Sequence, residues 1–234
     1  MGLLKKISKT GWIYSFAIIF NRAVPAWLFR CRRFVVYELD PDSFDGPANE
    51  QLKLSWCKSP TEIEKAVELS YFDPSTSEGE NFACQSVLGG KLVGALWKTG
   101  GCFVEKDLGV EIVLAPQQNW LFSAYVDRSV RNSGIYSSIL RFVLSELKQQ
   151  GVHSPLVAVN PDNLGSNYIH AKHAANSPGT VLAIRFFKLA VCFASGRLKP
   201  DRWLTLNCRK NPIRLEIVSI QAAEPFKTTL PWRR

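Results

Sequence analysis

A short basic turn holds the residues whose types and spacing are most able to do chemistry. The turn, residues 127–134, contains Arg128, Arg131 and Gly134, and it lies between an apolar segment and an amphipathic one. The first backbone N–H groups of a helix have no partner within it, and its dipole adds partial positive charge at that end. A strand, such a turn and a new helix therefore predict a diphosphate site. The alternative is an ordinary strand–helix turn, since many carry an arginine and a glycine and bind nothing.

Two regular elements must position that turn. Residues 120–126 form an apolar run after the turn-prone residues 115–119, which indicates a strand. A helix is predicted from Ile135 to Gly151. Its apolar positions recur with nearly the period of an α-helix: Ile135, Ile139, Leu140, Phe142, Val143 and Leu147.

The turn also resembles a known motif. Residues 131–136, Arg-Asn-Ser-Gly-Ile-Tyr, are similar to the pyrophosphate loop of the GCN5-related N-acetyltransferase (GNAT) superfamily, whose pattern is Q/R-x-x-G-x-G/A. Tyr136 departs from the small residue at the last position. In that family the loop amides hold the diphosphate of acetyl-CoA. The resemblance thus implies acetyl-CoA as cosubstrate, no metal, and a binding set of Arg131, Asn132, Ser133, Gly134, Ile135 and Tyr136.

A second partial motif follows in the order that the family shows. A strand at residues 156–159 precedes Asn163, and a helix runs through Ser166 and Tyr168. Asn163 and Ser166 match the family's Asn and Ser, which implies that they also contact the coenzyme. His170 takes the place of the usual Tyr, and two alanines at 174–175 replace a Gly-Phe pair. The resemblance covers residues 50–195, with its motifs between 126 and 175.

The chemistry that the resemblance implies is direct attack of an amine on a thioester. The reaction needs a base for the ammonium proton, a backbone donor for the oxyanion, and an acid near the leaving thiolate. The resemblance assigns the backbone donor to Val126 or its neighbour and the acid to His170. Tyr168 competes for that role, although it points about 200° away around the helix. The alternative for His170 is a surface or packing histidine.

Three acids are candidates for the base: Glu105, Glu111 and Asp127. Glu111 is slightly preferred because it is predicted on a strand near the cleft. The alternative for each is a solvated carboxylate or one paired across strands.

Composition and charge define three segments. The chain has 234 residues, 46% of them apolar and 21% charged, which are the values of a globular domain. Its net charge of +9 belongs to the ends, because residues 1–33 hold seven basic residues and no acid, and residues 196–234 hold nine against three. We predict a basic amphipathic N-terminal segment (1–33), a GNAT-like domain (34–195) and a basic C-terminal extension (196–234).

The remaining patterns predict an α/β (α+β) fold with a mixed, mostly antiparallel sheet flanked by helices. Strands are expected at 34–39 and 52–57, and a helix from residue 60 to 72. Two glycines at 89–90 predict a hairpin of 82–88 with 91–97. Residues 102–104 and 109–114 suit an extra hairpin, 180–194 a strand or strand pair, and 203–206 with 215–220 a small hairpin.

The N-terminal segment has two equally weighted interpretations. Residues 12–20 are apolar but too short to span a bilayer. A basic, Trp- and Phe-rich segment suits a helix lying in an anionic membrane interface, or one packed on the domain or on a second subunit of a homodimer. A signal peptide is the third alternative. Six cysteines without C-x-x-C spacing argue against zinc and for a reducing, cytoplasmic protein. With the interfacial interpretation of residues 1–33, the protein is expected to be peripheral at the inner membrane face.

Three functions follow. The first is CoA-dependent N-acyltransfer, with acetyl-CoA as donor and a primary amine as acceptor, such as a nucleotide- or lipid-linked amino sugar in surface-polysaccharide synthesis. The second is a degenerate relative that binds CoA or a membrane without turnover. The third, nucleic-acid binding through the basic ends, has no supporting motif.

Overall fold

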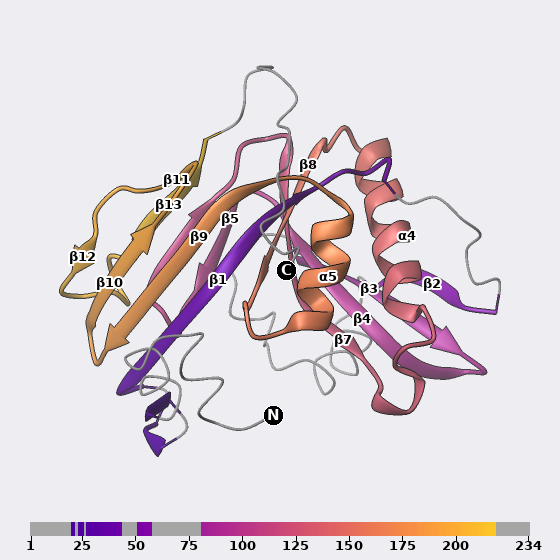
Figure 1. The fold of residues 1–234 in the computed structure, drawn as a ribbon, viewed down its shortest axis with the longest axis horizontal. Coiled ribbons are helices and arrows are strands. Elements are labelled where there is room, and N and C mark those ends of the chain that lie inside the picture. The colour runs from indigo at the N-terminus through magenta and orange to yellow at the C-terminus, as the bar shows by residue number, and fades with distance from the viewer. Residues whose placement is uncertain (1–19, 22, 26, 44–50, 58–80, 219–234) are drawn as a thin grey trace, which may run out of the picture.

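The computed structural model describes residues 20–21, 23–25, 27–43, 51–57 and 81–218. In this part of the chain two β-sheets and two α-helices form three layers (Figure 1). Both helices lie on one face of the larger sheet, and the smaller sheet packs on the opposite face.

The larger sheet has nine strands. Their spatial order is β12 (Leu204–Thr205), β10 (Leu189–Ala194), β9 (Ala174–Phe186), β1 (Phe29–Leu39), β8 (Ser154–Val159), β7 (Gln118–Val126), β4 (Lys91–Thr99), β3 (Asn81–Leu88) and β2 (Lys53–Cys57). All neighbours are antiparallel except β7 and β8, which run parallel. The predicted mixed and mostly antiparallel sheet is confirmed.

The smaller sheet has four strands in the order β11 (Leu198–Pro200), β13 (Ile213–Ile217), β6 (Val110–Val113) and β5 (Cys102–Glu105). Alternate residues of β13, namely Ile213, Leu215 and Ile217, are buried against the larger sheet. This strict alternation is what a strand with one face on a core requires.

The helices α4 (Ile135–Gln149) and α5 (Leu164–Lys172) cover the other face. The predicted apolar stripe of α4 is buried at Ile135, Ile139, Leu140, Val143 and Leu147. Phe142 is only partly buried and packs its ring on Trp56. Gly94 of β4 lets α4 approach closely, because a Cβ there would lie 2.8 Å from the Cδ1 of Ile139.

The ends of the chain are built further into the fold than predicted. Strand β1 begins at Phe29, not at residue 34, and lies between β8 and β9 in the interior of the sheet. The last residues of the predicted N-terminal segment therefore belong to the sheet. The predicted hairpin of 203–206 with 215–220 is wrong, since β12 pairs with β10 while β13 pairs with β6 and β11. Alternation reveals a strand but not its partner.

Other expectations are met locally or lie outside the described residues. The hairpins β3–β4, β5–β6 and β9–β10 form as predicted. The helix expected after residue 59, most of residues 1–33 and the tail beyond 218 are not described. In the described part of the chain no helix is long and apolar enough to cross a membrane. Five of the six cysteines are buried.

Candidate active site

The parallel strands β7 and β8 are paired over only part of their length and then diverge. Their register runs from Gln118 opposite Ser154 to Leu121 opposite Val157. Beyond that pair β7 continues to Val126 and β8 to Val159 without pairing. The unpaired backbone edges open a crevice in the middle of the sheet.

A bulge in β7 marks the start of this divergence. Ala95 of β4 is opposite Tyr125, but Trp97 is opposite Phe122, so β7 uses three residue steps where β4 uses two. Ser123 carries the distortion with φ of 50°, a left-handed value that a non-glycine residue rarely adopts. The irregularity in β7 is therefore at Ser123, three residues before Val126.

Val126 itself belongs to the regular ladder. It is opposite Gly94 of β4, and its carbonyl oxygen accepts a hydrogen bond from Nε of Arg131 at 3.0 Å. Its assignment as the oxyanion donor stays a prediction, and the bulge at Ser123 is the better-placed source of amides, because it opens onto the crevice.

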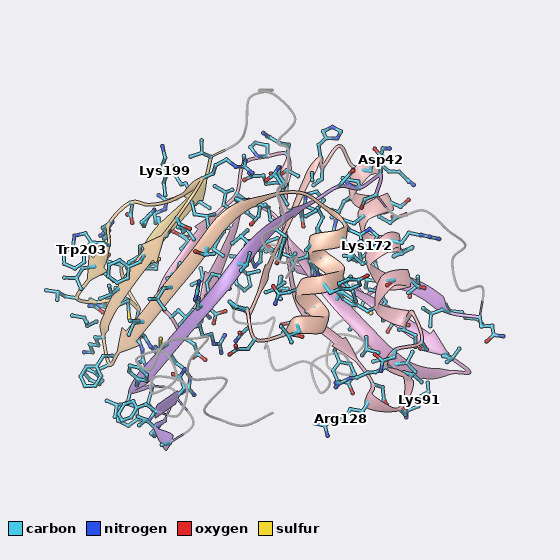
Figure 2. All side chains as sticks on the ribbon, viewed as in Figure 1. Asp42, Lys91, Arg128, Lys172, Lys199 and Trp203 are labelled. Atoms are coloured by element: carbon cyan, nitrogen blue, oxygen red, sulfur yellow. The ribbon has the colours of Figure 1, made fainter. Side chains whose placement is uncertain are left out.

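After β7 the chain makes a capped turn, η2 (Arg128–Val130). Asp127 accepts hydrogen bonds from the backbone nitrogen of Ser129 at 2.9 Å and from its hydroxyl at 2.6 Å. These bonds from Ser129 hold the pKa of the Asp127 carboxyl below its usual value, with Lys91 3.7 Å away. Asp127 thus caps the turn, and its candidacy as the base stays a prediction. Lys91 and Arg128 lie at the same end of the molecule (Figure 2).

The turn ends in Gly134, whose φ of 79° requires glycine's freedom. No atom lies within 4 Å of the position that a Cβ would take there. The first backbone bond of α4 runs from the nitrogen of Ser138 to the carbonyl of Gly134. The amides of Gly134 to Ser137, at the start of α4, have no backbone acceptor recorded among the described residues, as expected for the first turn of a helix. Residues 131–134 are exposed, so this helix start lies at the surface.

The side chain of Tyr136 turns inward instead of into the turn. Its hydroxyl is 2.7 Å from Nε2 of His170 on α5. Nδ1 of His170 is 2.7 Å from the carbonyl oxygen of Ser166. Because a carbonyl can only accept, Nδ1 bears the proton and Nε2 accepts from Tyr136.

Burial governs the protonation of this pair. His170 is only 2% exposed, and its burial lowers the pKa of the imidazole. Burial likewise raises the pKa of the Tyr136 phenol. His170 therefore stands as a neutral link between α4 and α5, stacked on Tyr37 of β1. Its role as the acid stays a prediction.

The other predicted residues of α5 have local tasks. Asn163 caps the helix by accepting from the backbone nitrogen of Ser166 at 3.2 Å. The hydroxyl of Ser166 is also 3.2 Å from Nδ1 of His170. Tyr168 is 73% exposed and points away from His170, as helical periodicity requires.

A cavity of about 620 Å³ opens at the diverging strands on the face opposite α4. It is lined from β7 by Trp120 to Ser123, from β8 by Ala158 and by Asn160 just after it, from β1 by Arg32 to Phe34, and from the β5–β6 hairpin by Phe103 to Asp107 and Ile112. Phe103 stacks on Trp120 at 5.9 Å and contacts Phe122 at 4.8 Å between ring centroids. The cavity has an aromatic base and a charged rim.

Glu105 is the carboxylate of that rim with a perturbed pKa. Burial raises the pKa of its carboxyl; Arg32, at 3.5 Å, opposes this and Asp107 reinforces it. A carboxylate with a raised pKa beside a cleft is suited to accept a proton. Glu111, the preferred base from the sequence, does not line this cavity, and its carboxylate pairs with Arg214 at 3.0 Å.

Sequence patterns identified the turn, the helix α4 and the start of α5. They did not identify Arg32 as a residue of the site, and they ranked Glu111 above Glu105 as the candidate base. Arg32 was counted with the basic N-terminal segment, since nothing local showed that β1 inserts beside β8. In the described part of the chain, no group of histidine, cysteine and acidic residues could hold a metal ion.

No protein-family model and no curated protein matches the chain. Among solved structures it is similar to a GNAT-family acetyltransferase from Novosphingobium aromaticivorans, with 12% identity, a TM-score of 0.47 and coverage of 66% of this chain and 63% of that one. It is similar to a GCN5-related N-acetyltransferase from Kribbella flavida, with 13% identity, a TM-score of 0.47 and coverage of 80% and 64%. The chain thus spans less than two thirds of the length of either.

A third similar structure is the ribosomal-protein-S18-alanine N-acetyltransferase of Escherichia coli, with 15% identity, a TM-score of 0.40 and coverage of 51% of this chain and 74% of that one. All three similar structures are named as acetyltransferases, two of them as GNAT-family or GCN5-related.

Proposed function

We propose that this protein is a CoA-dependent N-acyltransferase that moves an acetyl group from acetyl-CoA to a primary amine. The observation that carries the proposal is the exposed helix start at Gly134 to Ser137, whose backbone amides have no recorded acceptor among the described residues, after a strand that diverges from its parallel neighbour. Such amides, with Arg128 and Arg131 beside them, suit a diphosphate.

The residues present fit the coenzyme. The turn offers its donors without obstruction, because Gly134 leaves open space and the Tyr136 side chain points to His170. Asn163 and Ser166, at the start of α5, remain proposed contacts. Bound there, acetyl-CoA supplies an activated thioester carbonyl.

We assign the base to Glu105 and the oxyanion donors to the β7 bulge around Ser123. The amine nitrogen bonds to the acyl carbon as the carbon–sulfur bond breaks, and Glu105 takes the ammonium proton. The thiolate takes its proton from solvent; His170 can serve as the acid only after gaining a proton on Nε2, which the Tyr136 hydroxyl could then relay. The bulge amides lower the cost of the oxyanion.

The aromatic base of the cavity favours an acceptor with a flat apolar face. Phe103, Trp120 and Phe122 would pack against the C–H face of a sugar ring, which is consistent with an amino sugar. A role in surface-polysaccharide synthesis extends this same proposal.

Thermal unfolding with and without acetyl-CoA tests the coenzyme site. We expect ligand at 100 times its Kd to stabilise the native chain by about 2.7 kcal/mol, which raises the Tm by a few degrees. Gly134→Glu should abolish that rise, because it places a carboxylate among the phosphate donors.

Gly101→Glu is the matched control. Gly101 also has a positive φ, 73°, and open space, but it lies in the β4–β5 turn. It should keep the rise in Tm. A wild-type chain that shows no rise would contradict the coenzyme site. A rise in Tm with no release of the CoA thiol in the presence of any amine would favour the second candidate, a CoA-binding relative without turnover.

We further propose peripheral attachment to an anionic membrane through residues 1–33. Trp27, within that segment, is 54% exposed, and its ring contacts edge to face that of Phe187, which is 49% exposed and has Lys188 over it. Exposed aromatics with basic neighbours suit a membrane interface. The chain should sediment with anionic but not neutral vesicles, and a chain lacking residues 1–19 should not. Equal sedimentation of both chains would contradict this attachment.

A further inference from the structure

A second cavity, of about 800 Å³, adjoins the first. The two share Val104, Lys106 and Asp107, all on the β5–β6 hairpin. The rest of its lining comes from Trp27, from Arg185 of β9, from Gly109 and Glu111, and from Cys208, Arg209, Lys210 and Pro212 after β12. The two cavities are therefore adjacent, with the β5–β6 hairpin contributing to both.

Positive charge predominates in the second cavity. Its lining includes Lys106, Arg185, Arg209 and Lys210 against two acids, Asp107 and Glu111. Each acid pairs with an arginine that does not line the cavity, since Asp107 is 3.8 Å from Arg32 and Glu111 is 3.0 Å from Arg214. The structure records no ion pair for Lys106, Arg209 or Lys210 with any described residue.

Arg185 gives the cavity a preorganised donor. It is only 3% exposed, and its Nη1 donates to the carbonyl oxygen of Lys106 at 3.3 Å, which holds it against the hairpin. A guanidinium held in a partly dehydrated wall binds phosphate more strongly than one in open water.

Gly109 allows two segments that line this cavity to pack closely. Its φ is 67°, and a Cβ there would lie 2.4 Å from the Cβ of Cys208. The segment that carries Arg209 and Lys210 can therefore approach the β5–β6 turn closely. The cations come from three separate parts of the chain and converge because of this contact.

We propose that the second cavity binds a phosphate or diphosphate group of the acyl acceptor, while the acceptor's amine lies at Glu105 in the first cavity. The acceptor is then an anionic amine, such as an amino sugar joined to a phosphate. The proposal rests on the acyl-transfer function proposed above. Lys106, Arg209 and Lys210 call for more than one negative charge, which a phosphate supplies and a single carboxylate does not.

Calorimetric titration with inorganic pyrophosphate tests the anion site separately from catalysis. The titration uses full-length Gly134→Glu, in which the turn before α4 no longer takes a diphosphate. We expect binding to persist there and to weaken at least tenfold when Arg209→Glu and Lys210→Glu are added. Lys53→Glu with Lys199→Glu makes the same change of net charge on exposed residues elsewhere and should alter the affinity less than twofold.

Thiol release with acetyl-CoA tests the acceptor class in the otherwise wild-type chain. A phosphorylated amino sugar should have a kcat/KM at least tenfold above that of the same sugar without phosphate. The Arg209→Glu, Lys210→Glu variant should lose this preference, whereas Lys53→Glu with Lys199→Glu should keep it. Nucleotide-linked and lipid-linked amines, as separate arms, identify the source of the phosphate.

Equal pyrophosphate affinity in the paired charge variants would overturn the anion site. Equal kcat/KM for the phosphorylated and neutral amines would overturn its role in acceptor binding. Absence of thiol release with every amine, while pyrophosphate binding still depends on Arg209 and Lys210, would instead overturn the acyl transfer.

Discussion

Among single residues, Glu105 shows how the surroundings of a carboxyl group decide whether it is suited to act as a base. Two acids on the same hairpin, Glu105 and Glu111, differ in what surrounds them. Glu111 pairs at 3.0 Å with Arg214, whereas Glu105 is turned into a cavity wall where burial raises its pKa. A desolvated carboxylate is the better base, because it holds a proton more tightly once it has taken one.

A pH profile of kcat/KM compares these two acids. Glu105 accepts a proton only when ionised, so we expect activity to fall as the pH drops through a pKa raised above the usual carboxyl value. Glu105→Gln should lower kcat/KM by about 10²- to 10⁴-fold and remove that acid limb.

Glu111→Gln is the matched control and should keep both rate and profile. The reverse result would restore Glu111 as the base. The substitution Glu105→Gln should lower activity without lowering the free energy of unfolding, because burial disfavours the ionised carboxylate in the folded chain. Glu105→Gln is therefore expected to be at least as stable as the wild type near neutral pH.

Between elements, one polar contact joins the start of α4 to α5. The Tyr136 hydroxyl, His170 and the Ser166 carbonyl form a continuous chain of hydrogen bonds. Tyr136 thus replaces the small residue of the motif without filling the turn, since its ring is used for packing against α5. The departure from the motif is explained by this contact.

Urea unfolding of single and double variants measures this link. Tyr136→Phe leaves Nε2 of buried His170 without its donor and should cost about 1–3 kcal/mol of unfolding free energy. Adding His170→Phe should cost less than the sum of the two single changes, because no polar atom is then left unpaired.

Thiol release from the same variants tests His170 as the acid. A His170→Phe chain that binds CoA normally but turns over more slowly would support the catalytic role. Unfolding effects that simply add would contradict the hydrogen-bonded link.

Across the whole molecule, Glu38 and Arg197 tie the centre of the large sheet to the connection between β10 and β11. Nη2 of Arg197 is 2.8 Å from the Glu38 carboxylate, and both side chains are mostly buried. Ser154 and Asn176 belong to the same network. Burial raises the pKa of Glu38, but hydrogen bonds from Arg197, Ser154 and Asn176 outweigh it, so the pKa is lowered overall.

Arg197→Gln should destabilise the chain by about 3 kcal/mol at neutral pH, since it leaves a buried carboxylate without its cation. The pKa of Glu38 is lowered by folding, so its stabilisation is complete above the unfolded-state pKa and is lost as the pH falls through the folded-state pKa. The difference from wild type should therefore shrink between pH 7 and about pH 3, as urea titrations can measure.

Arg202→Gln serves as the control. Arg202 pairs with Asp201 at the surface, where the side chains are 48% and 30% exposed, so its loss should leave the stability nearly unchanged. An equal cost for both arginines, or a pH-independent cost for Arg197→Gln, would contradict this account.

Much of the site was accessible from local patterns. The strand before the turn, the glycine at 134, the apolar stripe of α4 and the cap at Asn163 all depend on residues a few positions apart. Backbone sterics, helical periodicity and capping act over that range, so one sequence determines them. The open amides of the turn follow directly from these local choices.

The tertiary structure alone decided which acid faces the cavity and which strands enclose it. Arg32 meets Glu105 because β1 inserts between β8 and β9, and Arg185, Arg209 and Lys210 converge from segments distant in the chain. Strand alternation does not specify a partner, and the pKa of a carboxyl depends on neighbours that only the packed chain brings close. The local sequence thus determined the glycine turn and the helix start at which we propose that a diphosphate binds, and long-range pairing decided which side chains lie across from it.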